Sequence, residues 1–335
     1  MWVPKKMINV EKVNTLLQHS IKENQFTNGG PNTTSLEKII KDKLHIDKSV
    51  VCVSNGTVAL WAIVSCFELF YSKPLQFSTQ SFTFPSSAQG PLENVHIVDI
   101  DKDGGMDLDK IPPCDGIIVT NVFGNVVDIE KYEIWCKQNN KFLIFDNAAT
   151  PYTSYKGKNS SNYGNASTIS FHHTKPIGFG EGGCIIIDSK YEKTLRTVLN
   201  FGIDNQSISP KWNPKGGNYK MSDIQAVYII QYLDHFKKIK DHAESLYRYF
   251  SNNTTLTMYP NFSDDTPFVS CICFFSENSN EIIKKLTEQN IFSRKYYYPL
   301  IDSEIANYFF NKIVCIPCTI DMTITDIDFI IKIIE

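Results

Sequence analysis

The chain has 335 residues, of which 42% are hydrophobic and 21% are charged, and its formal net charge is −3. These values are typical of a globular protein with a large core and exclude a disordered chain. No segment carries the run of basic residues that nucleic-acid binding needs, and the longest apolar stretch, residues 58–67, is too short to span a bilayer. The first residues lack the apolar core and cleavage site of a signal peptide. We therefore expect a cytoplasmic protein that binds neither nucleic acid nor membrane.

The first half of the chain alternates between helical and extended patterns. Apolar spacing predicts helices over residues 13–21 and 36–44, a strand over 49–54 and a helix over 57–70. Four further strands, with a helix at 128–138 between the last two, are predicted at residues 74–79, 95–100, 116–123 and 141–146. Strands that alternate with helices and read as unbroken apolar runs predict an α/β fold with a mostly parallel sheet, covered on both faces. Such sheets bind ligands beyond the C-terminal ends of their strands.

The second half predicts two more strands and then a change of pattern. Strands are expected at 167–173 and 183–188, and one long helix is expected from Met221 to about Phe250. A smaller α+β region follows, with predicted elements at residues 267–275, 281–289 and 324–334. We therefore expect a large α/β domain over residues 1–240 and a small C-terminal α+β domain over residues 241–335.

Nine cysteines are present, and two close pairs are candidates for metal ligands. Cys315 and Cys318 have the C-x-x-C spacing of a zinc or redox site, and Cys271 and Cys273 alternate on a predicted strand. The alternative is that these are small apolar side chains in a strand-rich region. Because no histidine lies near either pair, we expect reduced thiols and no metal.

A strand-to-helix junction at residues 54–57 is the first candidate for chemistry. Gly56 and Thr57 begin a helix there, so they offer free backbone N–H groups, a hydroxyl and the positive end of a helix dipole. This favours a phosphate site, although ordinary N-capping explains the same residues. A second candidate is Asp146, a carboxylate at the end of an apolar strand, where it lies at the ligand edge of the sheet or caps the segment that follows.

Lys175 is the third candidate, in a Gly-rich turn just past a predicted strand. A lysine there serves as a Schiff-base nucleophile if it is partly desolvated, and is otherwise a solvated surface residue. The phosphate site, the strand-end aspartate and the lysine occur in this order along the chain. Together they are the parts that pyridoxal phosphate requires, because they hold its phosphate, its pyridine nitrogen and its aldehyde.

At this point the sequence resembles the DegT/DnrJ/EryC1/StrS family of sugar aminotransferases, which have the aspartate-aminotransferase fold (fold type I) and bind pyridoxal phosphate. The resemblance covers nearly the whole chain. The segments that carry it are residues 27–44, 53–62, 77–88, 98–111, 119–149, 170–183, 216–233 and 293–300. The most specific of them are SFHHTKPIGFGEGG and, some 40 residues later, NYKMSDIQA.

The resemblance implies a role for each site residue. Lys175 bonds the cofactor aldehyde and moves the proton between the cofactor and the sugar, while Asp146 pairs with the pyridine nitrogen and keeps it protonated. Phe84 stacks on the ring. The phosphate is held by Gly56, Thr57 and Ser170 and by Asn218 of a neighbouring subunit, so the resemblance also implies a homodimer with shared active sites.

Two departures from the family pattern bear on these roles. The family usually has Gln or His after Glu-Asp-Ala-Ala, whereas this chain reads Phe145-Asp146-Asn147-Ala148-Ala149, and the ring contact from that side chain is therefore in doubt. Lys220 stands where the family commonly has Arg. Neither departure affects the lysine or the pyridine aspartate.

The resemblance implies transfer of an amino group from L-glutamate to a nucleotide-linked keto-sugar. Gly180-Glu181-Gly182-Gly183 favours C4 over C3, so the expected product is a viosamine-type 4-amino-4,6-dideoxy hexose on dTDP or UDP, made for glycan biosynthesis. The alternatives are a C3 aminotransferase, a sugar dehydratase of the same fold and a non-catalytic regulator. Lys175 argues against the dehydratase, which carries His there, and the intact site residues argue against the regulator.

Overall fold

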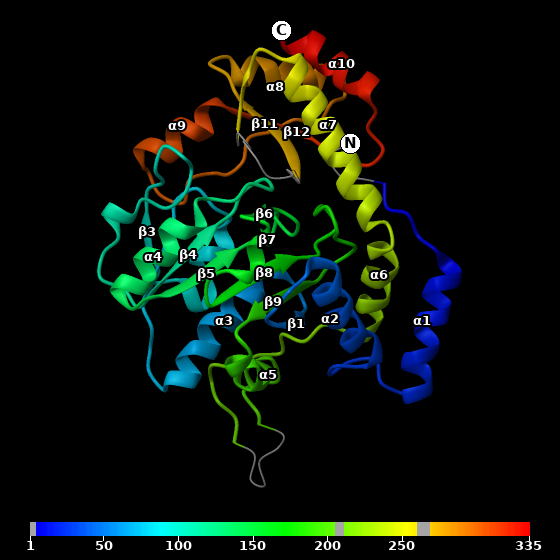
Figure 1. The fold of residues 1–335 in the computed structure, drawn as a ribbon, viewed down its shortest axis with the longest axis vertical. Helices are drawn as coiled ribbons and strands as arrows, with labels where there is room; N and C mark the ends of the chain where they lie inside the picture. Colours follow the sequence, from blue (N-terminus) through cyan, green and yellow to red (C-terminus); the bar gives the residue numbers. More distant parts are fainter. Residues whose placement is uncertain (1–4, 205–210, 260–268) are drawn as a thin grey trace.

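A computed structural model describes residues 5–204, 211–259 and 269–335. The main sheet is built from β1 (Ser49–Val53), β2 (Phe77–Gln80), β3 (His96–Val98), β4 (Gly116–Thr120), β5 (Phe142–Asp146), β8 (Ala166–Ser170) and β9 (Gly183–Ile187). Their order is β1-β9-β8-β5-β4-β2-β3 (Figure 1). In this sheet β9 pairs antiparallel with both of its neighbours, β1 and β8, and the remaining pairs are parallel. The predicted mostly parallel sheet is confirmed.

Helices cover both faces of this sheet (Figure 1). Successive residues of β1 point to opposite faces of the sheet. Val50 packs with α2 and α6 on one face, and Val51 packs with α3 and α5 on the other. Burial on both sides explains why the strands read as unbroken apolar runs. The helices of this part are α1 (Val10–Glu23), α2 (Pro31–Leu44), α3 (Gly56–Tyr71), α4 (Ile129–Asn139), α5 (Glu192–Leu199) and α6 (Asp223–Leu233), and a small hairpin pairs β6 (Ser154–Tyr155) with β7 (Lys158–Asn159).

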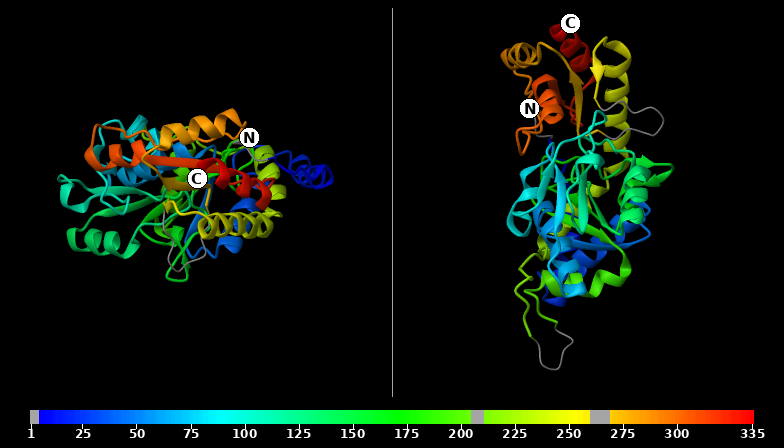
Figure 2. Two further views of the ribbon diagram at one scale, coloured as in Figure 1. Left: turned by 90° about the horizontal axis from the view of Figure 1, so that it is seen from above. Right: turned by 90° about the vertical axis from the view of Figure 1, so that its left-hand side faces the viewer.

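A second, three-stranded antiparallel sheet lies beyond one end of the main sheet (Figure 2). Its strands are β10 (Thr257–Met258), β11 (Cys271–Phe275) and β12 (Ile313–Pro317). A separate apolar cluster joins it to α7, α8 and α10. The helices of this region are α7 (Phe236–Asn253), α8 (Ser279–Glu288), α9 (Glu304–Lys312) and α10 (Ile324–Ile334). The domain boundary expected at 240/241 stays a prediction, and it falls inside the continuous helix α7.

Several predicted elements differ from the structure. The single helix expected from Met221 to Phe250 is two helices, because the chain leaves helical geometry at His235, where ψ is 2°. The strand expected over 116–123 ends at Thr120, and Phe123 then takes a left-handed φ of 59°. Helix α9 and strand β12 were not predicted. In the predicted strand 267–275, Pro267 and Phe268 lie outside the described residues.

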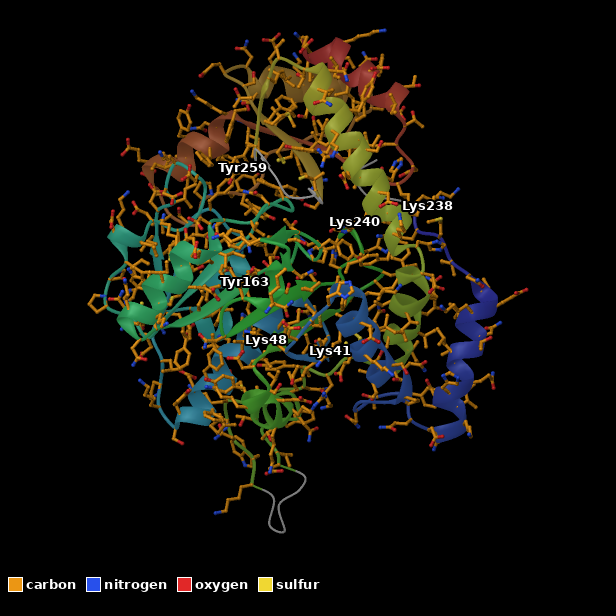
Figure 3. All side chains as sticks on the ribbon, in the orientation of Figure 1. Lys41, Lys48, Tyr163, Lys238, Lys240 and Tyr259 are labelled. Atoms are coloured by element: carbon orange, nitrogen blue, oxygen red, sulfur yellow. The ribbon has the colours of Figure 1, made fainter. Side chains whose placement is uncertain are left out.

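The two sheets meet through aromatic and polar contacts. Tyr259, which directly follows β10, lies between the sheets (Figure 3) and packs edge-on against Phe123 and Phe309. Asp99 accepts hydrogen bonds from the backbone N–H groups of Ile305 and Ala306 at 3.0 and 3.1 Å, so it caps the start of α9. The C-terminal region is thereby fixed against the edge of the main sheet. In the parts of the chain that are described, no helix is both long and apolar enough to cross a membrane.

Candidate active site

Polar residues collect where the parallel strands end. Asp146 ends β5, and its strand register places it beside Thr120 of β4 and Thr168 of β8. Ser170 ends β8 at the same edge. Because β1 and β8 both pair antiparallel with β9, β1 also ends at this edge, and Gly56 lies just beyond it. The polar residues predicted from the sequence thus meet at the edge where sheets of this kind bind ligands.

Asp146 is buried, with 3% of its surface exposed. Its Oδ1 atom accepts two hydrogen bonds, from the backbone N–H of Ala148 and from the hydroxyl of Thr168, both at 3.0 Å. No described residue donates a hydrogen bond to Oδ2. Burial raises the pKa of Asp146, although these two hydrogen bonds and the charge of Lys175 oppose the increase. The carboxylate therefore has one oxygen held in place and one available to a ligand.

The loop between β8 and β9 holds Lys175 in a tight turn. The Lys175 N–H donates to the carbonyl of His172 at 2.8 Å, and the Gly178 N–H donates to the carbonyl of Lys175 at 3.0 Å. A Cβ atom at Gly178 would lie 1.8 Å from the His172 carbonyl oxygen, so only glycine fits there. The Gly-rich sequence is thus required by the turn that positions the lysine.

The environment of Lys175 favours its neutral amine. Burial lowers the pKa of Lys175, while the charges of Asp146 and Cys271 oppose that decrease. Lys175 and Asp146 affect each other's pKa, yet within the described residues they form no direct ion pair. A neutral amine is the nucleophilic form, and the separation of the two groups leaves space for a ligand between them.

A second lysine contacts this loop, and the sequence did not indicate it. The Lys6 ammonium donates to the Lys175 carbonyl at 3.2 Å and to the Tyr232 hydroxyl at 3.4 Å. It also lies 4.5 Å from the centre of the Tyr232 ring. Burial lowers the pKa of Lys6 to about 7. Lys6 therefore connects the N-terminal segment to the backbone of the candidate catalytic residue.

An anion site is formed where α3 begins. The side chain of Asn55 accepts a hydrogen bond from the Val58 N–H at 3.0 Å, but in the described structure the N–H groups of Gly56 and Thr57 have no partner. A Cβ atom at Gly56 would lie 3.0 Å from the Cβ of Ser170, so the glycine allows the helix start to approach that hydroxyl. Two free N–H groups, a hydroxyl and the helix dipole suit a phosphate.

Comparison with known proteins identifies the family. The model of the DegT/DnrJ/EryC1/StrS aminotransferase family matches residues 8–335. The chain belongs to this family. It is 26% identical to the dTDP-4-amino-4,6-dideoxy-D-glucose transaminase of Shigella dysenteriae, over 93% of this chain and 91% of the relative. It is 23% identical to the UDP-4-amino-4,6-dideoxy-N-acetyl-beta-L-altrosamine transaminase of Campylobacter jejuni, over 94% of this chain and 91% of the relative.

Solved structures agree with the fold of this aminotransferase. The Helicobacter pylori aminotransferase PseC, involved in the biosynthesis of pseudoaminic acid, superposes with a TM-score of 0.86 at 19% identity and covers 100% of this chain and 97% of its own. The Streptococcus pneumoniae protein Spr1654, solved in a PLP form, superposes with a TM-score of 0.85 at 18% identity. The superposition covers 99% of this chain and 97% of the Spr1654 chain. These likenesses confirm the predicted fold class.

Phe84 follows β2 at the same edge of the aminotransferase sheet. Its neighbour Thr83 shares a hydrogen bond of 2.6 Å with the hydroxyl of Thr120, and Thr120 is paired with Asp146. The Phe84 ring is 53% exposed although the residues before it are buried. An exposed aromatic side chain at this edge of the sheet is compatible with stacking on a ring. The stacking role itself stays a prediction.

Asn218 lies on the exposed stretch that leads to α6. Its backbone bridges to Asn200, and the next two residues pair with the end of β1, where the Ser54 N–H donates to the Tyr219 carbonyl at 2.9 Å. Lys220, at the position where the family commonly has Arg, donates to the Asn200 side chain at 3.1 Å. The structure contains one chain, so the contact of Asn218 with a partner's site stays a prediction.

The residues present fit the pyridoxal phosphate expected from the sequence. Oδ2 of Asp146 and the amine of Lys175 have no hydrogen-bond partner in the described structure, and the Gly56–Ser170 approach leaves a cradle that a Cβ atom would fill. A carboxylate, an amine and an anion site are the three contacts that this cofactor needs.

Besides Lys6, two contributors to this site were missed in the sequence. Thr168 fixes Oδ1 of Asp146, and its position two residues before Ser170 on a strand, facing the same side, was a usable signal. Gln80 accepts a hydrogen bond from the Thr120 N–H at 3.0 Å and orients the next strand. No sequence pattern distinguishes Gln80, because its role depends on the neighbouring strand.

Proposed function

We propose that this aminotransferase uses pyridoxal phosphate to move an amino group from L-glutamate to C4 of a nucleotide-linked 4-keto-6-deoxy hexose. The carrier is dTDP or UDP, and the product is a 4-amino-4,6-dideoxy sugar for glycan biosynthesis in the cytoplasm. The observation that carries the proposal is the placement of Asp146, Lys175 and the Gly56–Ser170 cradle at one edge of the sheet.

The cofactor, when bound, supplies an aldehyde that takes up an amine and a ring that accepts electrons. The protein's own groups do the rest. Oδ2 of Asp146 would hold the proton on the pyridine nitrogen, because a negative charge in contact with that nitrogen favours its protonated form. The Nζ atom of Lys175 accepts the proton from the substrate carbon and returns it, because burial favours its neutral form. Gly56, Thr57 and Ser170 hold the phosphate and orient the ring.

The names of the relatives support the choice of substrate. The Shigella and Campylobacter proteins are named as transaminases of dTDP-linked and UDP-linked 4-amino-4,6-dideoxy sugars. Glu181, in the Gly-Glu-Gly-Gly segment that favours C4, lies 3.6 Å from Nε2 of His172 on the Lys175 loop. The sugar carbon that receives the amine is expected to be C4, because the relatives are named for 4-amino sugars and the Gly-Glu-Gly-Gly segment favours C4.

Product analysis tests this function. The purified protein is incubated with L-glutamate and a panel of dTDP- and UDP-linked 3-keto and 4-keto sugars, and the products are identified by mass spectrometry and NMR. We expect an amine at C4 of a 4-keto-6-deoxy hexose. Amination of 3-keto sugars alone would establish the C3 alternative, a product that loses oxygen without gaining nitrogen would establish a dehydratase, and no turnover would favour the regulator.

Lys175→Ala is the decisive variant for the mechanism. It should fold and still bind the cofactor, but it should not complete either half of the transfer, because no other described amine lies within the loop. Lys5→Gln, an exposed lysine near Lys6, is the matched control and should leave the rate unchanged. Near-normal transamination by Lys175→Ala would remove the lysine from the mechanism.

We further propose that the enzyme is a homodimer with composite sites, in which Asn218 reaches the phosphate in its partner. Mixing Lys175→Ala subunits with Asn218→Ala subunits tests this. In a mixed dimer one site carries both changes and the other carries neither, so activity should reappear on mixing. Absence of recovery in mixed dimers, or full activity of a monomer in light scattering, would contradict the shared site.

A further inference from the structure

Three cysteine thiols form a cluster that the proposed reaction does not use. Cys271 and Cys273 belong to β11 and Cys315 belongs to β12, and their three sulfur atoms all lie within 4.8 Å of one another. The sulfur atoms of Cys271 and Cys273 are 3.4 Å apart. All three residues are buried. Among the described histidine, cysteine, aspartate and glutamate residues, this is the one group with the geometry to hold a metal ion.

The backbone of the small sheet brings these thiols together. Residues 271 and 273 are two apart on one strand, so their side chains point to the same face. Cys273 lies directly opposite Cys315 in the antiparallel register. The N–H and carbonyl of Cys315 are bonded to Arg294 on its other side, so the Cys273–Cys315 pair is of the narrow, non-hydrogen-bonded type. The three sulfur positions are therefore set by the sheet before any ligand arrives.

We propose that Cys271, Cys273 and Cys315 form a three-sulfur site for a thiophilic metal ion, of which Cu(I) is the best match. Sulfur-only ligands select soft ions. A structural zinc ion would require a fourth ligand. Cys318 does not supply it, because its thiol is directed to the Ala243 carbonyl at 3.8 Å and is not part of the cluster.

The positions of the three sulfur atoms carry this assignment, because folding brings all three within 4.8 Å of one another. The sequence predicted no metal at the Cys315–Cys318 pair. The structure instead brings Cys315 together with Cys271 and Cys273.

Anaerobic competition with a chromophoric Cu(I) chelator tests the site in the full-length holoenzyme. We expect one tightly bound Cu(I) per chain, with sulfur as its only neighbours in X-ray absorption. Cys273→Ser and Cys315→Ser should each weaken binding by roughly 100-fold or more, since even partners outside the ligand shell change metal affinity about 10–100-fold. Cys318→Ser is the matched control and should keep wild-type affinity.

The fold of each variant is checked by circular dichroism and by transamination without added metal. Three outcomes would overturn the site: no tight Cu(I) in the wild-type protein, equal binding by Cys273→Ser, Cys315→Ser and Cys318→Ser, or preferential uptake of zinc with a fourth ligand. If both cluster variants fail to fold, Cys271→Ser takes their place, and wild-type affinity in that variant would also overturn the site.

Discussion

Asp146 and Asp223 are two buried aspartates that the protein surrounds in opposite ways. Asp146 accepts two hydrogen bonds, both on Oδ1, and burial raises its pKa. Asp223 accepts five hydrogen bonds on its two oxygens, from Ser20, Asn32 and Thr33. Burial also opposes ionisation of Asp223, but these hydrogen bonds lower its pKa. Asp146 therefore keeps one carboxylate oxygen for a ligand, whereas both oxygens of Asp223 accept hydrogen bonds from the protein itself.

The positions of the two aspartates explain the difference. Asp223 is the first residue of α6, and its partners belong to α1 and to the first turn of α2, so one side chain joins three helices. A Cβ atom at Gly30 would lie 2.6 Å from its Cγ, so glycine is needed for the close approach. Asp146 ends a strand of the main sheet and lies near the loop that carries Lys175. The number of donors around a buried carboxylate thus separates a structural role from a functional one.

Asp146→Asn should have the largest effect, and it should fall on activity. The variant keeps the shape but loses the charge that holds the pyridine proton, so the rate should fall by roughly two or more powers of ten, about 3 kcal/mol of barrier. Asp146→Glu should lose less, through misplacement. Single-turnover formation of the aminated cofactor with glutamate measures this. A rate for Asp146→Asn within a few-fold of wild type would mean that another group protonates the ring.

Asp223→Asn should have the reverse pattern, with a loss of stability and little loss of rate. The new amide cannot accept all five hydrogen bonds and presents its own donors to the N–H groups of α2, so the free energy of unfolding should fall by about 3 kcal/mol. Urea unfolding measures this. Ser222→Ala, at the exposed N-cap of the same helix, is the control and should cost about 1 kcal/mol. If Asp223→Asn instead left stability intact and abolished turnover, the comparison would fail.

Gly56→Ala should weaken the cofactor site without affecting either aspartate. The added Cβ would lie 3.0 Å from the Cβ and 3.3 Å from the Oγ of Ser170, so it narrows the cradle. We expect cofactor affinity to fall about tenfold, which is about 1.4 kcal/mol. Titration of the cofactor-free protein, followed by absorbance, measures the change. Gly157→Ala is the control for backbone strain, because its new Cβ meets no atom within 4 Å while its φ of 77° is left-handed, and it should leave cofactor affinity unchanged.

The two aspartates should change the free energy of unfolding with pH in opposite directions. These changes should be smaller than the effects of the substitutions above. Because its pKa is lowered in the folded protein, Asp223 contributes to the free energy of unfolding above the pKa of an unfolded aspartate, about 3.9. This contribution is lost as the pH falls through the pKa of Asp223 in the folded protein. Asp146 has the opposite effect because its pKa is raised in the folded protein. Its contribution to the free energy of unfolding is lost as the pH rises through the pKa of Asp146 in the folded protein. Urea unfolding of the cofactor-free protein between pH 3 and 8 measures both.

The two variants isolate these signs. The stability deficit of Asp223→Asn relative to wild type should shrink as the pH falls toward the folded pKa of Asp223. Asp146→Asn should be most favourable relative to wild type at neutral pH, where the native carboxylate is ionised and buried. Parallel pH curves for the wild type and both variants would show that neither carboxylate has a shifted pKa.

Local pattern predicted most of the main sheet, and it singled out three candidate site positions. The apolar run that ends at Asp146 predicted β5, because a strand buried on both faces is apolar throughout. The strand predicted over residues 167–173 corresponds to β8, which ends three residues earlier, at Ser170. The Gly-rich turn marked Lys175, since the turn has no room for a Cβ at Gly178. These features depend on neighbours in the sequence, which is why they can be read from it.

Other features depended on residues far apart in the chain. The break between α6 and α7 was missed because α6 is apolar on most of its surface, α7 continues with a clear apolar face, and no proline or glycine marks His235. Helix α9 begins where Asp99, some 200 residues earlier, caps its N–H groups. The thiol cluster was missed because the sequence spacing joined Cys315 to Cys318, while strand pairing joins it to Cys273.

The sequence by itself determined the family and the α/β sheet, and it singled out Lys175 and Asp146 as the lysine and the aspartate of the proposed chemistry. Only the tertiary structure decided that Asp146 keeps a free oxygen while Asp223 has none, that Lys6 reaches the Lys175 carbonyl, and that three thiols meet in the small sheet. The physical reason is that secondary structure follows short-range periodicity, whereas burial, hydrogen-bond supply and the resulting pKa shifts come from groups that folding brings together across the chain.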